Sequence, residues 1–355
     1  MKKITAILLC LSLLLSLCAC GSPEPQPKPQ ELSRSYTDDA GRTLYIPENI
    51  QRIVPSAPLA QIILLTLAPE MVVGLADEVE DSARGILPER VFSQPYLGSL
   101  YAGSELNLEA LASTAPDLII DMGEVKKSTK EDLDNLQTQT AIPAVFVSLS
   151  LENMGQTYRT LGALLGREER AELLARRCEE IYARTMDIME QVGENKVDCL
   201  YITGQEGLNV IAADSYHAEL LDLLTDNLAV VDNPLSKGTG NEVTMEQIAL
   251  WDPEFILFGP DSIYAHVAQR GTWMSLQAVS EGNYVEVPQI PYNWMSMPPS
   301  VQRYLGLIWL PSVLYPQYCD YEVEAEICEL LELFYDREIS HEIYGRIMAN
   351  AFPVA

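Results

Sequence analysis

The chain has little positive charge and very little histidine. It carries 23 lysine and arginine residues against 51 aspartate and glutamate residues, a formal net charge of -28, and it has only three histidines. An acidic surface of this kind offers no basic patch of the size that nucleic acid requires, so no nucleic-acid partner is expected. The histidines stand in separate segments without ligand-like spacing, so we expect neither a bound metal ion nor a resident cofactor.

Motifs of catalysis are missing as well. The sequence contains no GxSxG, no HExxH, no phosphate loop of the GxxxxGK type and no CxxC pair. The glycine-rich piece at 237–242 lacks the preceding strand of a dinucleotide site and is interpreted as a flexible loop at the rim of a cleft. We therefore predict that the chain is not an enzyme. Its 355 residues, 48% of them hydrophobic, are still enough to build two lobes around sizeable cores.

The first twenty residues resemble a bacterial lipoprotein signal. Lys2 and Lys3 precede the apolar run 4–17, which is too short to span a bilayer, and Ala19-Cys20 follows in register. The resemblance implies that residues 1–19 are a signal peptide that is cut off and that Cys20 is the lipidation site, where acyl chains such as palmitate are attached. The alternative is a plain secretory signal with an incidental cysteine.

Residues 20–35 are predicted to be the lipidated cysteine followed by a proline-rich tether. Proline alternates with polar residues at positions 23, 25, 27 and 29, a pattern that supports neither a helix nor an inner strand. Because the body is acidic, electrostatic attraction will not hold it on anionic lipid, so the acyl chains must supply the membrane anchor. The expected location is the extracytoplasmic face of the cell membrane.

Four cysteines remain in the body, and the sequence leaves their pairing open. Outside the cytoplasm they could form disulfides in three connectivities. Cys178 falls in a helical pattern and Cys199 in an apolar strand-like run, which favours free, buried thiols for these two. The other two are Cys319 and Cys328.

Short apolar strands alternate with helices on both sides of one long helical segment. Strand-like pieces occur at 52–56, 71–74, 116–121 and 144–147, and again at 197–202, 229–231, 255–258 and 285–287. This rhythm predicts an N-terminal lobe at 36–150 and a C-terminal lobe at 195–355, both α/β with mostly parallel sheets. Residues 151–194 contain no proline and place apolar side chains at helical spacing, so we predict one long bridging helix, open to a kink near Gly166.

One internal repeat supports two similar lobes. The segment 107–120 aligns without gaps on 244–257, at the constant offset that separates Glu109 from Glu246. Each copy has the pattern of a capped helix, a proline break and a buried strand, and each carries its glutamate at the same position.

This arrangement resembles the class III solute-binding proteins of ABC importers, the family that serves ferric siderophores, haem and cobalamin. The resemblance covers about 36–335. It is carried by the two repeats together with Asp38-Asp39-Ala40-Gly41-Arg42, Pro47, Arg52-Ile53-Val54, Val73-Gly74 and the segment 273–282. The chain departs from the family at Ala68-Pro69, where Leu-Gly is frequent, and at 98–101.

The resemblance implies two similar α/β lobes bridged by one long helix, with a ligand cleft between them. The implied partners are an ABC permease dimer with its ATPase subunits and a small-molecule metal chelate, whose iron or cobalt would belong to the ligand. A helical bridge permits less closure than strand linkers would, so small movements are expected on binding.

For Glu109 and Glu246 the resemblance implies permease docking. In the family a glutamate on each lobe enters an arginine pocket on one of the two permease subunits, and two carboxylates held apart on a rigid body suit a two-fold partner. The alternative is local: Asn107 and Thr244 are good N-caps, and a glutamate in the first turn complements the helix dipole by under about 1 kcal/mol.

The ligand cleft should be lined by loops that follow strand ends. The candidates are Ser56, Ala57, Pro58, Asp121, Met122, Gly123 and Glu124 on the N-terminal lobe and Gln205, Glu206, Tyr216, His217, Gly240, Asn241, Tyr292, Asn293, Trp294 and Met295 on the C-terminal lobe. The stretch 292–301 has no cation, so a neutral or cationic ligand, such as a hydroxamate chelate or a corrinoid, is easier to accept than an anionic catecholate. Haem stays open, with Tyr216, His217 or Tyr292 as an axial ligand.

The sequence thus predicts a lipid-anchored binding protein that delivers an iron-siderophore, haem or cobalamin-type ligand to an ABC importer permease. The alternative is a secreted lipoprotein enzyme that acts on a metal complex, with a chelatase-like activity. A third hypothesis, an adhesion or scaffold lipoprotein, predicts no deep cleft. The fold alone does not separate the first two.

Overall fold

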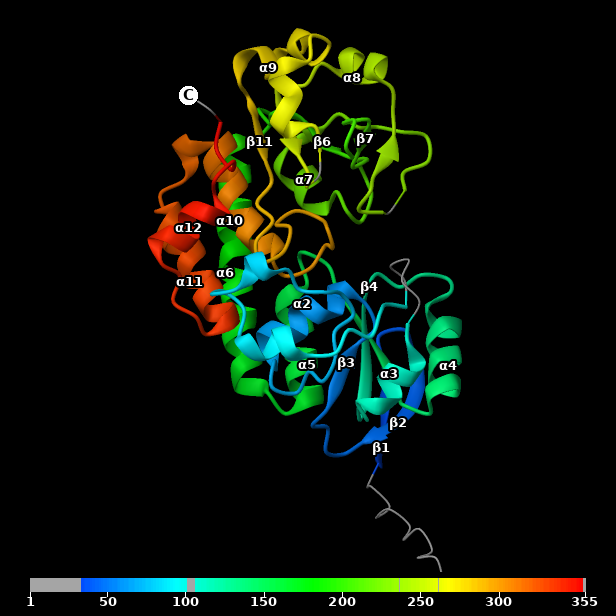
Figure 1. Cartoon of the computed structure of the whole chain (residues 1–355). Coiled ribbons are helices and arrows are strands. Elements are labelled where there is room, and N and C mark those ends of the chain that lie inside the picture. The colour runs from blue at the N-terminus through cyan, green and yellow to red at the C-terminus, as the bar shows by residue number, and fades with distance from the viewer. Residues whose placement is uncertain (1–32, 101–105, 236, 261, 354–355) are drawn as a thin grey trace, which may run out of the picture.

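Two α/β lobes share a helical support along one side of the molecule (Figure 1). The computed structural model describes residues 33–100, 106–235, 237–260 and 262–353. The predicted signal peptide and the predicted lipidation site Cys20 lie outside the described residues. The prediction of a tether over 20–35 is wrong at its end, because residues 33–35 already pair with the second strand of a hairpin.

The N-terminal lobe is built on a parallel sheet in the order β3-β4-β5, beside the antiparallel hairpin β1-β2. Strand β4 is buried at every position, as expected for the central strand of a covered parallel sheet. The lobe consists of β1 (Ser33–Thr37), β2 (Thr43–Pro47), β3 (Ile53–Pro55), α2 (Pro58–Leu67), η1 (Asp81–Ala83), η2 (Glu89–Ser93), α3 (Leu108–Ser113), β4 (Leu118–Gly123), α4 (Thr129–Thr140) and β5 (Ala144–Ser148).

The C-terminal lobe has a mixed sheet in the order β11-β10-β6-β7-β9, with β8 beside β6. Strands β8, β10 and β11 extend the sheet in parallel, whereas β7 and β9 pair antiparallel. The predicted strand at 229–231 is not formed, because pairing along this segment ends with β8. The elements are β6 (Asp198–Thr203), β7 (Asn209–Val210), α7 (Glu219–Leu224), β8 (Asp226–Asn227), β9 (Asn241–Glu242), α8 (Met245–Trp251), β10 (Phe255–Phe258), η3 (Tyr264–Gln269), η4 (Trp273–Ser275), α9 (Gln277–Glu281) and β11 (Tyr284–Glu286).

The predicted single helix at 151–194 is two helices, α5 (Met154–Leu165) and α6 (Glu168–Val192). Gly166 ends α5 in the left-handed conformation, with a φ of 65°, and the chain folds back on itself there. Positions along the two helices meet in opposite order, with Gly155 beside Glu179 and Gly162 beside Ala171. Of these two helices, only α6, about 37 Å long at 1.5 Å per residue, reaches from one lobe to the other.

The last helices do not belong to the C-terminal lobe alone. Helix α10 packs against α6 and α7, whereas α11 packs against α10 and against α2 of the N-terminal lobe. Figure 1 shows α10, α11 and α12 beside α6, on one side of both lobes. The predicted lobe at 195–355 therefore ends in helices that complete the bridge. These elements are α10 (Arg303–Leu314), η5 (Pro316–Tyr318), α11 (Val323–Tyr335) and α12 (His341–Ile347).

The two copies of the repeat have the same backbone course. The side chain of Asn107 accepts a hydrogen bond from the backbone N–H of Ala110, and Thr244 does the same for Gln247. Ala115 and Asp252, which occupy the same repeat position, both have a left-handed φ, of 44° and 40°. A buried strand follows in each copy, β4 or β10. The predicted capped helix, break and strand are confirmed in both lobes.

The predicted fold class, two α/β lobes with mostly parallel sheets, is confirmed. One apolar core runs from the N-terminal lobe through α5 and α6 into the C-terminal lobe, and a smaller cluster lies on the outer side of each sheet. Within the described part of the chain, no helix combines the length and the apolar character needed to cross a bilayer.

Helices α5 and α6 pack so closely at Gly162 that this position has no room for a side chain. A Cβ at position 162 would lie 2.4 Å from the Cβ of Ala171, and neither atom can move without its backbone. We expect Gly162→Ala to lower the free energy of unfolding by about 1–3 kcal/mol, because α5 and α6 must separate. Urea unfolding measures this. Gly345→Ala, where nothing lies within 4 Å, is the matched control and should leave stability equal or slightly higher; equal effects of the two changes would contradict the packing argument.

Candidate functional site

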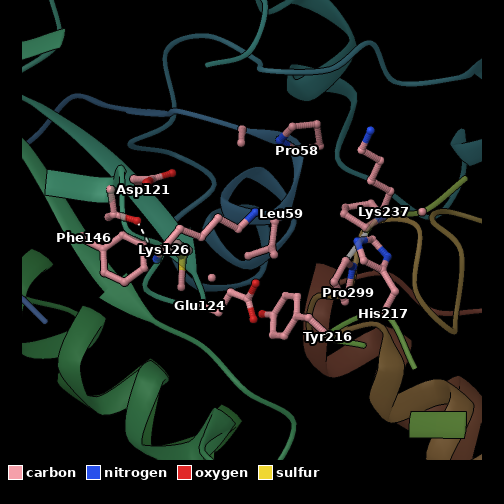
Figure 2. A pocket seen from close by; sticks show the side chains of 16 residues that line it. Pro58, Leu59, Asp121, Glu124, Lys126, Phe146, Tyr216, His217, Lys237 and Pro299 are labelled. Atoms are coloured by element: carbon pink, nitrogen blue, oxygen red, sulfur yellow. Dashed lines mark hydrogen bonds between the residues drawn. The ribbon is translucent and has the colours of Figure 1, made fainter. Parts of the chain in front are cut away.

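A pocket of about 310 Å³ lies between the two lobes (Figure 2). On the N-terminal lobe it starts at the first turn of α2 and at the carboxyl end of β4, the usual place for a ligand in an α/β fold. Both lobes and the loop after β11 contribute side chains. The lining consists of Ala57, Pro58, Leu59, Asp121, Met122, Gly123, Glu124, Lys126, Thr129, Phe146, Tyr216, His217, Lys237, Gly238, Pro298 and Pro299.

Hydrogen bonds between neighbouring strand ends fix the N-terminal wall. The hydroxyl of Ser56, just after β3, donates to the carboxylate of Asp121 in β4, and both side chains are buried. The backbone N–H of Ser56 donates to the carbonyl of Ile120 at 3.0 Å. Gly123 ends β4 with a φ of 139°, a conformation that L side chains rarely adopt, and the chain turns there into the pocket rim.

On the opposite wall, Tyr216 connects the two lobes. Its hydroxyl donates to the carbonyl of Leu149, across the cleft, at 2.9 Å. Burial raises the pKa of Tyr216 well above its ordinary range, and the nearby carboxylates of Glu219 and Glu124 act in the same direction, so the phenol stays protonated. The guanidinium of Arg303 lies 5.7 Å from the ring centre.

His217 is held in one orientation. Its Nδ1 lies 2.6 Å from the carbonyl oxygen of Ser296. A carbonyl can only accept, so the hydrogen sits on Nδ1 and Nε2 keeps its lone pair. Burial lowers the pKa of His217 to about 4, and the cations Arg303 and Lys126 add to the effect. The imidazole is therefore neutral at physiological pH.

Two lysines flank the pocket from opposite lobes. Lys126 follows the end of β4, Lys237 comes from the loop before β9, and both are exposed. Figure 2 shows them on opposite walls, with Glu124 at the rim near Tyr216. The expectation of a cleft without cations is therefore wrong, because it considered only the stretch 292–301. A pocket with a lysine on each side attracts carboxylate or other anionic groups.

Eight of the predicted cleft residues line the pocket: Ala57, Pro58, Asp121, Met122, Gly123, Glu124, Tyr216 and His217. Ser56 lies behind the wall. Gln205 is exposed in the turn after β6. Asn241 is buried and accepts a hydrogen bond from the backbone N–H of Leu235 at 3.0 Å. These last three residues do not face this pocket.

The predicted cleft residues at 292–295 are turned away from the pocket. Trp294 is fully buried, donates from its indole nitrogen to the carbonyl of Ile290, and packs edge-on against Trp309. Met295 is also in the core, and the hydroxyl of Tyr292 is buried without a partner among the described residues. Asn293 is buried beneath the loop. This placement of Tyr292 gives no support to its expected role as an axial ligand of haem.

The loop 237–242, expected at the cleft rim, does line the pocket through Lys237 and Gly238, but sequence reasoning missed Leu59, Lys126, Thr129, Phe146, Pro298 and Pro299. Lys126 had a usable signal, because it lies only two residues beyond Glu124, which was a candidate as a residue after a strand end. Phe146 lies in the predicted strand 144–147 and has the pattern of an ordinary strand residue. Pro298 and Pro299 belong to a loop whose direction depends on tertiary packing.

Glu109 and Glu246 are exposed in the first turns of α3 and α8. Within the described ranges, neither carboxylate takes part in an ion pair. Figure 1 shows α3 on the N-terminal lobe and α8 on the C-terminal lobe, both away from α11 and α12. The two carboxylates are thus free to meet a partner that spans both lobes.

No metal site or disulfide is found in the part of the chain that the structure describes. No three histidine, cysteine, aspartate or glutamate side chains in that part are grouped to hold a metal ion. The four body cysteines are free, with Cys178 and Cys199 buried and Cys319 and Cys328 partly buried.

Comparison with known proteins gives one family match. The family described as "Periplasmic binding protein" matches residues 76–291. A curated relative, the Fe(3+)-citrate-binding protein YfmC of Bacillus subtilis (strain 168), is 24% identical over 214 residues. The match covers 59% of this chain and 64% of the relative, so less than two thirds of that protein is spanned.

Solved structures share the fold over nearly their whole length. An ABC transporter solute binding protein from Sulfurospirillum deleyianum DSM 6946 has a TM-score of 0.81 and 28% identity, covering 89% of this chain and 99% of that one. The molybdate periplasmic binding protein MolA of Haemophilus influenzae has a TM-score of 0.69 and 18% identity, covering 86% and 99%. At 18% identity the likeness to MolA shows the fold alone.

The low pKa of His217 predicts a pH dependence of stability. The folded pKa is about 4 against an ordinary 6.5, so the unfolded chain binds the proton more readily. The contribution of His217 is present in full above pH 6.5 and is lost as the pH falls toward 4. Urea unfolding between pH 7.5 and about 4.5 should show that His217→Gln loses less stability on acidification than the unmodified protein. Parallel profiles would contradict the buried, neutral imidazole.

Proposed function

The chain belongs to the periplasmic binding protein family, and we propose that it is the solute-binding component of an ABC importer that captures an iron chelate outside the cytoplasm. The observation that carries the proposal is the pocket between the lobes, which takes side chains from both of them. The family and its structural relatives are solute-binding proteins and not enzymes, which argues against the chelatase-like alternative. The chelate would pass unchanged to a permease dimer with its ATPase subunits.

The pocket favours a small anionic chelate as the cargo. Lys126 and Lys237 can each meet a carboxylate, and Tyr216 and His217 add polar atoms between them. Its volume of about 310 Å³ lies at the lower end of the range for ligand pockets, which suits a compact ferric chelate better than haem or a corrinoid. The relative named for Fe(3+)-citrate supports the same class. Iron would enter as part of the ligand.

Permease docking through Glu109 and Glu246 is part of the proposal. Both carboxylates are exposed, occupy equivalent positions in the two repeats, and have no ion pair within the described residues. Their N-caps are separate residues, Asn107 and Thr244, so helix capping does not require the glutamates. Lipidation at Cys20 completes the proposal and would keep the protein beside its permease on the extracytoplasmic face.

Substitutions of Lys126 and Lys237 test whether the ligand is an anionic chelate. We expect Lys126→Ala and Lys237→Ala each to weaken the binding of ferric citrate to the body at 33–355 about tenfold, because each removes a charge-assisted contact. Calorimetric titration measures the affinity. Lys127→Ala, an exposed lysine outside the lining, is the matched control and should bind as the unmodified protein does. Failure of the unmodified body to bind ferric citrate or any other anionic chelate would refute the proposed ligand class.

The docking glutamates are tested in transport. In a reconstituted importer, Glu109→Ala/Glu246→Ala should reduce uptake at least tenfold and leave ligand affinity in solution unchanged, since the carboxylates lie outside the pocket. Glu131→Ala/Glu342→Ala removes two exposed first-turn glutamates from α4 and α12 and serves as the control. Uptake at the unmodified rate by the first double variant would exclude this docking mode.

A further inference from the structure

Asn293 does not reach the pocket, yet it organises the segment that forms one of its walls. The side chain is 3% exposed. Its Oδ1 accepts hydrogen bonds from three successive backbone N–H groups, those of Met295, Ser296 and Met297, at 3.0, 2.8 and 3.2 Å. One amide oxygen therefore fixes the course of the backbone over 295–297.

The other end of the amide attaches this segment to the lobe. The Nδ2 of Asn293 donates to the hydroxyl of Tyr201, in the buried strand β6, at 3.2 Å and to Oε1 of Gln289 at 3.0 Å. Strand β6 is the strand that pairs with β7, β8 and β10. The position of 295–297 is thus set by the middle of the C-terminal sheet.

The same segment holds the imidazole in the pocket. The N–H of Ser296 donates to Asn293, and the carbonyl oxygen of Ser296 accepts a hydrogen bond from Nδ1 of His217 at 2.6 Å. No hydrogen bond to Nε2 of His217 is found among the described residues, and Nε2 is not one of their buried unpaired atoms. The lone pair on Nε2 is therefore open to the cavity that His217 lines (Figure 2).

We propose that Asn293 is a positioning residue for ligand recognition: it holds the Ser296 carbonyl where it keeps His217 as the Nδ1–H tautomer, so that Nε2 accepts a hydrogen bond from the captured ligand. The proposal rests on the proposed function, because it assumes that the pocket takes the ligand. It narrows the ligand to an anionic chelate that also carries a donor, such as an alcohol or acid hydroxyl or a metal-bound water.

This class follows from the distribution of donors and acceptors around the pocket. Lys126 and Lys237 are pure donors and suit carboxylates. The phenol hydrogen of Tyr216 is already donated to Leu149. Nε2 of His217 is an acceptor, so a ligand with carboxylates alone would leave it unpaired, whereas a hydroxycarboxylate chelate would satisfy both kinds of group.

The tautomer can be observed directly, because the chain has only three histidines. In the 33–355 body labelled with ¹⁵N-histidine, we expect the long-range ¹H–¹⁵N spectrum of His217 to show a protonated Nδ1 and an unprotonated Nε2. His217→Gln identifies the signal. A protonated Nε2 in the ligand-free protein would overturn the proposal, whatever the protein binds.

Variants of Asn293 test whether this side chain sets the tautomer of His217. Asn293→Ala should shift His217 to a mixture of tautomers, whereas Asn293→Asp, which keeps an acceptor for the three N–H groups, should restore the Nδ1–H form and most of the affinity lost by the alanine variant. Asn227→Ala is the matched control, because Asn227 is a second hydrogen-bonded asparagine of this lobe, partly buried and bonded to Asp222, Ile211 and Ala229 and not to the 295–297 segment. A His217 spectrum unchanged in Asn293→Ala would overturn the proposal.

A double-mutant cycle connects the tautomer to binding. With ferric citrate as the probe, Asn293→Ala and His217→Phe should each lower affinity about tenfold, and the double variant should lose no more than either single one. Independent losses that multiply to about a hundredfold would show that Asn293 does not act through His217. If the unmodified protein binds no anionic chelate, the proposed function fails, whereas a wrong tautomer with intact binding removes only this inference.

Discussion

An ion pair between the fully buried Arg303 and the partly buried Glu219 joins the parts of the molecule that form the pocket. The guanidinium of Arg303, at the start of α10, is fully buried and lies 2.6 Å from a carboxylate oxygen of Glu219 in α7. The other oxygen of Glu219 accepts the backbone N–H of Leu151, which follows the last strand of the N-terminal lobe. Removing Glu219 would leave the buried guanidinium of Arg303 without its charge partner, so the junction of the two lobes is strongly specified.

The same pair shapes the electrostatics of the pocket. Arg303 lies against the ring of Tyr216 and, together with burial, helps to keep His217 neutral. A neutral imidazole and a protonated phenol leave Lys126 and Lys237 as the cations at the pocket, opposed by Glu124 at the rim. A chain with a net charge of -28 can therefore still present a local site for an anion, because the screening length of about 8–10 Å in salt limits the reach of the acidic surface.

The sequence predicted the elements better than it predicted the direction of side chains in loops. Caps, proline breaks and buried strands have local signals, and Asn107, Thr244 and both repeat strands are where those signals put them. Gly166 was recognised as a break, but sequence alone does not distinguish a kink from a reversal, because that depends on whether α5 finds a surface on α6. The prediction that Trp294 lines the cleft was wrong for a related reason. In a loop without periodicity, only the tertiary contact with Trp309 decides which way the aromatic ring points.

The shared core also limits how the protein can select its ligand. Helices α6, α10 and α11 support both lobes. In addition, the hydroxyl of Ser300 donates to the carbonyl of Leu59, and the hydroxyl of Tyr304 donates to the carbonyl of Leu151, both on the N-terminal side. Lobes joined in this way move little, so a ligand is not enclosed by a large closure. Selection must instead come from groups that are already in place before binding, which gives the fixed orientation of His217 and the spacing of the two lysines their importance.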